Sequence, residues 1–138
     1  MDDEALRALL EGTRTIAVLG IKADPEADAW RVPAYLQGAG YRILPVNPTL
    51  EHVLGEPCAA RLADLASPVD LIDVFRAPRH LSAHVDEILS LATPPRAVWF
   101  QRGIRDDASA TRLEAAGIRV VQDRCVMVDH RRLLGTPP

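Results

Sequence analysis

Short apolar runs alternate along the chain with stretches whose apolar residues recur every three or four positions. Five runs have the length and composition of buried strands: residues 15–20, 41–46, 69–75, 97–100 and 118–121. Parallel strands require a crossover connection, which is usually a helix. The alternation therefore predicts an α/β fold, a three-layer sandwich around a five-stranded, mainly parallel sheet.

Four helices are expected around these strands. Two of them show stripes of one helical face: Val32, Tyr35, Leu36 and Ala39, and later Leu81, Val85, Ile88 and Leu89. The others are expected over residues 2–11 and about 106–116. No internal repeat or long linker divides the sequence, so residues 1–138 are expected to form a single domain.

Charge and cysteine content exclude several classes of protein. The chain has 16 basic and 19 acidic residues with no basic cluster, so we expect no nucleic-acid partner. No apolar run is long enough to cross a membrane, and the acidic start Met1-Asp2-Asp3-Glu4 is unlike a signal peptide. A cytoplasmic protein with no membrane partner is expected. Cys58 and Cys125 lack metal-ligand spacing and are expected to be reduced thiols.

The segments that follow the strands are where an open parallel sheet binds its ligands. After the first run, Gly20 begins a loop with the cation Lys22, a helix start capped by Asp28, and Arg31, which together suit a phosphate. The GxGxxG fingerprint is absent, which disfavours an NAD enzyme. The alternative is an ordinary strand-to-helix connection with solvated charges.

The next strand ends offer further polar and aromatic groups. Asn47 lies between two prolines and could contact a ribose or a base edge, unless the segment is simply a rigid turn. Phe75 and Arg76 could stack on a flat base and meet a phosphate, or serve as a core aromatic and a solvated cation. Gln101 follows the fourth run with a side-chain amide.

Several of these motifs, taken in order, resemble the small stand-alone CoA-binding domain proteins, relatives of the N-terminal domain of the succinyl-CoA synthetase alpha subunit. The resemblance runs from about Thr15 to Gly135 and rests on residues 16–20, 30–36, 40–48, 54–58, 69–76, 98–101 and 123–125. It implies a Rossmann-like fold and coenzyme A as the ligand. The synthetases carry a catalytic His in a second domain, for which this chain has no counterpart, so no ligase activity is implied.

The resemblance also implies which residues line the CoA site. Carried over by position, they are Gly20, Ile21, Lys22, Val46, Asn47, Pro48, Val74, Phe75, Arg76, Phe100, Gln101, Arg124 and Cys125, with Arg31 as a further cation. Relatives often place a Lys directly after the Asn-Pro pair, where this chain has Thr49-Leu50. Lys22, Arg31 or Arg76 would then have to supply the missing charge.

Two other constellations suggest chemistry of their own. His80, His84 and Glu87 fall on one helical face with ligand-like spacing, but the HExxH order is absent, which favours an exposed helix face over a metal site. Cys125 follows Arg124 and could react as a thiolate, form a mixed disulfide with CoA, or be an inert structural thiol. No metal site and no catalytic residue is expected.

We therefore expect a protein that binds CoA or an acyl-CoA without catalysis, as a carrier, sensor or store. Two alternatives stay open: a small NAD- or nucleotide-dependent enzyme on the same fold, and a module that binds a partner protein. The sequence does not exclude a homo-oligomer.

Overall fold

The computed structural model describes residues 1–135. Its strands are β1 (Thr15–Leu19), β2 (Arg42–Val46), β3 (His52–Val53), β4 (Glu56–Pro57), β5 (Leu71–Val74), β6 (Ala97–Phe100) and β7 (Arg119–Val121). Its helices are α1 (Asp3–Gly12), α2 (Asp28–Gly38), α3 (Leu81–Leu89), α4 (Asp107–Ala115) and α5 (Val126–Leu134). Two short 3-10 turns, η1 (Leu62–Asp64) and η2 (Pro78–His80), complete the elements. The five expected strands and four expected helices are confirmed.

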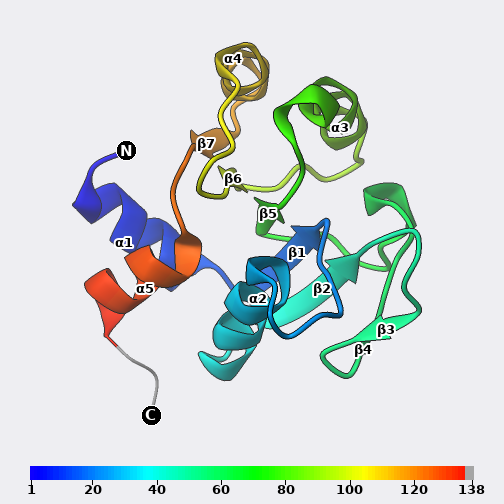
Figure 1. The fold of residues 1–138 in the computed structure, drawn as a ribbon. Helices are drawn as coiled ribbons and strands as arrows, with labels where there is room; N and C mark the ends of the chain where they lie inside the picture. The colour runs from blue at the N-terminus through cyan, green and yellow to red at the C-terminus, as the bar shows by residue number, and fades with distance from the viewer. Residues whose placement is uncertain (136–138) are drawn as a thin grey trace.

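Five of the strands form one sheet in the order β2-β1-β5-β6-β7, and all its neighbours are parallel. Figure 1 shows α1, α2 and α5 on one side of this sheet and α3 and α4 on the other. The predicted three-layer α/β architecture, which is Rossmann-like, is therefore confirmed. The strand order reverses after β2: the chain moves outward from β1 to β2, and the next strand of the sheet, β5, lies on the other side of β1. This order opens a crevice at the carboxyl ends of β1 and β5, where such sheets bind ligands.

Apart from Asp73 on β5, the central strands of the sheet are apolar on both faces because helices cover both. Ile16, Val18 and Trp99 pack with α1, α2 and α5, whereas Ile72 and Val98 pack with α3 and α4. No helix in the described part of the chain is long and apolar enough to cross a membrane.

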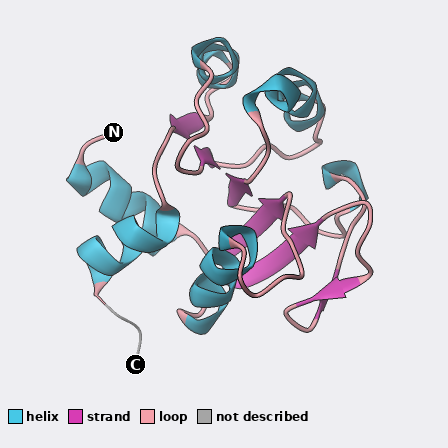
Figure 2. Cartoon of the chain, viewed as in Figure 1, coloured by secondary structure: helices cyan, strands magenta, loops and turns pink. Residues whose placement is uncertain are grey.

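Two strands and one helix were not foreseen from the sequence, and one capping prediction is wrong. The small antiparallel pair β3–β4 lies beyond β2, and α5 packs against α1 and α2 (Figure 2). The N-cap of α2 is Ala27, with no side-chain hydrogen bond. Asp28, expected there, is the first helical residue, and its carboxylate accepts instead from the Arg31 guanidinium.

The loops that follow β1, β2 and β5 are tied together by hydrogen bonds. The Gly20 N–H donates to the Val46 carbonyl at 3.0 Å, and the Phe75 N–H donates to the Leu19 carbonyl at 2.8 Å. Gly20 has φ +88°, and a Cβ built on it would lie 2.5 Å from the Phe75 carbonyl oxygen. Only glycine fits this close approach, which brings the loops of β1 and β5 into contact.

Candidate functional site

A pocket of about 520 Å³ opens at the carboxyl ends of β1, β2 and β5. Its lining comes from five segments: Leu19 and Gly20; Val46, Asn47, Pro48 and Thr49; Ala60 and Arg61; Arg76; and Ala83, His84 and Glu87 from α3. We call it the larger pocket. It lies at the reversal of the strand order, as the strand-end argument predicts for an open parallel sheet.

One wall of the larger pocket is a polar row that runs from Arg76 onto α3. The Arg76 Nε–H donates to His84 Nε2 at 3.3 Å, so the ring proton of the neutral imidazole lies on Nδ1. His84 Nδ1 is 3.8 Å from the Glu87 Oε1 atom, one helical turn further along α3. Burial, and after it the charges of Arg76 and His80, lower the pKa of His84, which favours this neutral form.

Arg61 extends the same wall on the Glu87 side. Burial raises the pKa of Glu87, and the nearby Arg61 charge and the Leu62 backbone N–H act against that rise. The Arg61 guanidinium also lies 3.3 Å from Asp64 Oδ1 in an ion pair whose side chains are 70% and 43% exposed. Nothing in the local sequence around Arg61 pointed to a site, because the residue reaches the pocket only through the turn after β4.

The opposite wall is shaped by Asn47, whose amide serves the protein itself. Asn47 Nδ2 donates to the Ile21 carbonyl at 2.7 Å, which ties the loops after β1 and β2 together. Asn47 Oδ1 accepts from both the backbone N–H and the hydroxyl of Thr49, each at 2.8 Å. The side chain therefore fixes the shape of the wall, with Pro48 and Thr49 presented to the pocket.

A smaller pocket of about 340 Å³ lies beside the larger one and shares Arg76 with it. Lys22, Phe75 and the start of α2 line this smaller pocket. Because they share Arg76, the linings of the two pockets together extend from the loop after β2 to Gly103 and Ile104. Lys22 and Arg76 are thus the predicted cations that the structure brings to the cavities.

The remaining predicted site residues line neither pocket. Ile21, Val74 and Phe100 are buried in the core. Gln101 is also buried, and its Oε1 accepts from the Val126 N–H at the start of α5. Arg31 is exposed and paired with Asp28. These side chains contribute to the shape of the fold around the strand ends rather than to a cavity wall.

Arg124 and Cys125 lie at the start of α5. The Arg124 guanidinium makes two hydrogen bonds to Asp129, at 2.6 and 2.7 Å, so its charge is already balanced. Cys125 is half-buried, and both cysteines are free thiols. The sequence argument that Arg124 would favour a Cys125 thiolate is weakened by this pairing. Among residues 1–135, no three His, Cys, Asp or Glu side chains cluster as metal ligands do.

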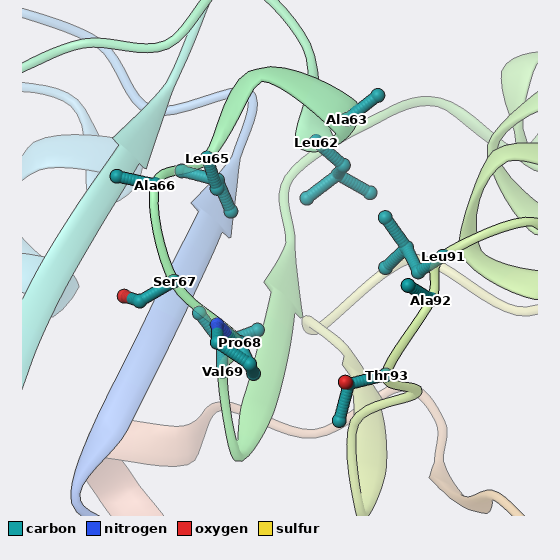
Figure 3. A pocket seen from close by; sticks show the side chains of 10 residues that line it. All are labelled: Leu62, Ala63, Leu65, Ala66, Ser67, Pro68, Val69, Leu91, Ala92 and Thr93. Atoms are coloured by element: carbon teal, nitrogen blue, oxygen red, sulfur yellow. The ribbon is translucent and has the colours of Figure 1, made fainter.

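A third hollow lies at the amino ends of β5 and β6, away from both pockets (Figure 3). It has about 220 Å³ and is lined by Leu62, Leu91 and other mostly apolar or small side chains between residues 62–69 and 91–93. The hydroxyls of Ser67 and Thr93 are its polar groups in the view of Figure 3. Its position and lining offer no charge to a phosphate.

Comparison with known proteins shows the family to which the chain belongs. Residues 14–131 match the CoA binding domain family. The uncharacterized protein YneT of Bacillus subtilis is 31% identical over 125 residues, which cover 91% of each chain. A Thermus thermophilus protein of known structure, described as cell-free ID.343, is 50% identical with a TM-score of 0.92, over 96% of this chain and 99% of that one. A hypothetical protein from Pyrococcus horikoshii is 33% identical with the same TM-score, over 98% and 94%. The chain therefore belongs to the CoA-binding domain family.

Proposed function

We propose that this protein binds coenzyme A or an acyl-CoA across the carboxyl ends of β1, β2 and β5, without chemical conversion of the ligand. The observation that carries the proposal is the larger pocket, which lies at the reversal of the strand order and has Arg76 between it and the smaller pocket. A guanidinium shared by two adjoining cavities suits a long anionic ligand that passes from one to the other.

The two pockets divide the ligand between them. The adenosine part fits the larger pocket, where Val46, Pro48 and Leu19 offer apolar surface. The diphosphate lies at Arg76 and Lys22 beside Gly20, and the pantetheine arm continues along Phe75. Lys22 and Arg76 thereby act as the cations for the phosphates, while Asn47 holds the loops in place.

Binding without catalysis is supported by the side chains that line the larger pocket. Among the described residues that line this pocket there is no Cys or Ser, and the Thr49 hydroxyl donates a hydrogen bond to Asn47 Oδ1. His84 is held between Arg76 and Glu87, so its ring nitrogens already face charged protein groups. These observations support the proposal of a carrier, sensor or storage role.

Isothermal titration calorimetry with CoA, acetyl-CoA and NAD⁺ tests the proposal. We expect CoA and acetyl-CoA to bind and NAD⁺ to bind more weakly. Arg76→Ala should weaken CoA binding by about 1–3 kcal/mol, since it removes a charge-assisted contact. Arg79→Ala, which removes an exposed neighbouring charge, is the matched control and should change little. Failure of CoA to bind at millimolar concentration would refute the proposal.

The absence of chemistry is tested separately by incubating acetyl-CoA with the protein and measuring free thiol. The free thiol should form at the same rate as in buffer. Release above that rate, lost in His84→Gln, would instead favour an enzyme, and capture of a partner protein with no small ligand bound would favour an interaction module.

A further inference from the structure

The larger pocket contains two arginines that approach it from different segments of the chain. Arg76 follows β5 and lies against Gly20, with its Cδ 3.0 Å from a Cβ built on that glycine. Arg61 comes from the far side of β2, because Ala59, two residues earlier, bridges Val46 on the outer edge of the sheet. Both line the same cavity.

The two guanidinium groups enter the larger pocket from different sides. Arg76 follows β5 and donates to His84 on α3, whereas Arg61 lies beyond β2 and pairs with Asp64 in η1. β2 and β5 lie on opposite sides of β1, and neighbouring strands are about 4.8 Å apart, so the two segments start about 10 Å from each other. This spacing suits two phosphates at different positions of one ligand better than a single phosphate.

The Arg61 guanidinium is free to serve a ligand. Its protein partner is Asp64, at 3.3 and 3.4 Å, in an exposed pair. Such exposed pairs are weak, and a phosphate is a stronger acceptor for a guanidinium because it offers more charge and a bidentate geometry. Arg76, in contrast, is anchored on His84.

We infer that Arg61 is a specificity-determining residue that binds a second phosphate on the ribose of the nucleotide, separate from the diphosphate at Arg76. This inference rests on the proposed function and names the ligand class more narrowly. The pocket selects a nucleotide with phosphate at two positions of its adenosine, as in CoA, over one with the diphosphate alone, as in dephospho-CoA or ADP. Arg61 comes from the turn after β4. The sequence had instead suggested Lys22, Arg31 or Arg76 as the replacement for the Lys that relatives often carry after the Asn-Pro pair.

Calorimetric titration of CoA and 3′-dephospho-CoA into the wild type and Arg61→Gln tests the inference. The wild type should bind CoA at least tenfold more tightly than dephospho-CoA. Arg61→Gln should reduce that ratio to about one through weaker CoA binding, with dephospho-CoA affinity unchanged. Arg61 is exposed, so this variant should fold like the wild type.

Two matched variants separate the roles of the charges. Arg76→Gln should weaken CoA and dephospho-CoA by the same factor and leave the ratio intact. Asp64→Asn, which frees Arg61, should raise the ratio, whereas Arg79→Gln should not change it.

The possible outcomes separate the role of Arg61 from the proposed binding of CoA. Equal binding of CoA and dephospho-CoA by the wild type, or a ratio that persists in Arg61→Gln, would overturn the role of Arg61 while leaving CoA binding intact. Binding of neither ligand would overturn both.

Discussion

Asp73 is a carboxylic acid enclosed in the middle of the sheet, opposite Val18 on β1 and Trp99 on β6. It is fully buried, and within residues 1–135 neither of its oxygens has a hydrogen-bond partner. Burial raises the pKa of Asp73 well above its usual value, so the folded protein favours the protonated carboxyl. Asp73 therefore lowers the free energy of unfolding, and the effect increases as the pH rises.

The direction in which pH changes the free energy of unfolding follows from proton linkage. Above about pH 4 the unfolded chain has lost the Asp73 proton while the folded chain keeps it, so the free energy of unfolding falls as pH rises. The loss is about 1.4 kcal/mol per pH unit until the folded group titrates. We expect Asp73→Asn to be more stable than the wild type at pH 8, with the difference shrinking toward pH 4.5, as measured by urea unfolding.

Asp70→Asn is the matched control for this prediction. The Asp70 carboxylate accepts backbone N–H bonds from Arg14 and Thr15, and despite some burial its pKa is lowered. Its contribution to stability is present above about pH 4 and lost as pH falls, so the substitution should destabilise the protein at pH 8. Equal pH dependence of Asp73→Asn and the wild type would contradict the assignment.

Gly20 gives a second prediction at the residue scale. Gly20 and Gly40 both have positive φ, at +88° and +102°, but a Cβ at Gly40 would meet nothing within 4 Å. Gly40→Ala should cost the backbone strain alone, about 1–2 kcal/mol. Gly20→Ala should cost a further 1–3 kcal/mol, roughly, because the Phe75 carbonyl must move. Thermal unfolding of both variants compares them, and equal losses would show that the loops after β1 and β5 separate easily.

Single residues also show how far the sequence could predict the site. Gly20, Lys22, Asn47 and Arg76 were found because each directly follows a strand, and strand ends are visible in the apolar pattern. Arg61 was not, because its place in the pocket depends on the bridge between Ala59 and Val46. His84 and Glu87 were noticed only as potential metal ligands.

Among the elements, α5 is the helix that the sequence did not predict. Its buried stripe is Val126, Asp129, His130 and Leu133, so two of the four core positions are polar and the helical pattern is hidden. Both polar residues find partners that a one-dimensional pattern does not show. Asp129 accepts hydrogen bonds from Arg124 and Arg132, and His130 Nδ1 lies 2.8 Å from the Tyr35 hydroxyl on α2.

The His130 contact predicts that the attachment of α5 weakens in acid. Burial lowers the pKa of His130, so below about pH 6.5 the unfolded chain takes up a proton that the folded chain resists. The free energy of unfolding should therefore fall between pH 7 and pH 5, by at most about 1.4 kcal/mol per unit. In His130→Gln this fall should be smaller, although the lost contacts should cost about 1–2 kcal/mol at pH 7.

Chemical denaturation at both pH values measures this effect, with a His52→Gln substitution at an exposed position of β3 as the control. The His52→Gln variant should have the same free energy of unfolding as the wild type at both pH values. An unchanged pH dependence in His130→Gln would show that other groups account for the acid sensitivity.

At the scale of the whole molecule, the sequence predicted the layers but not the order of the strands. Buried runs and helical stripes are local patterns, and they predict the five strands of the main sheet, four of the helices and the parallel direction. The placement of β5 beside β1 depends on contacts between distant segments, such as the close approach of Gly20 to Phe75. The depth and lining of the larger pocket follow from that order, so they could not be deduced locally.

The distribution of cavities predicts where ligand binding changes the dynamics of the protein. Hydrogen exchange in the presence of CoA should slow at residues 20–22, 47–49, 60–61 and 75–77, which line or adjoin the two pockets. Residues 65–69 and 91–93, around the hollow in Figure 3, should exchange as before. Slowed exchange confined to the latter segments would place the ligand at the amino ends of the strands.

Every residue that lines the larger pocket lies between Leu19 and Glu87, and Gly103 and Ile104 are the later residues that line the smaller one. In the described part of the chain, β6, α4, β7 and α5 line neither pocket. Evolution can therefore alter the stability of these elements while the residues that would contact a ligand stay the same.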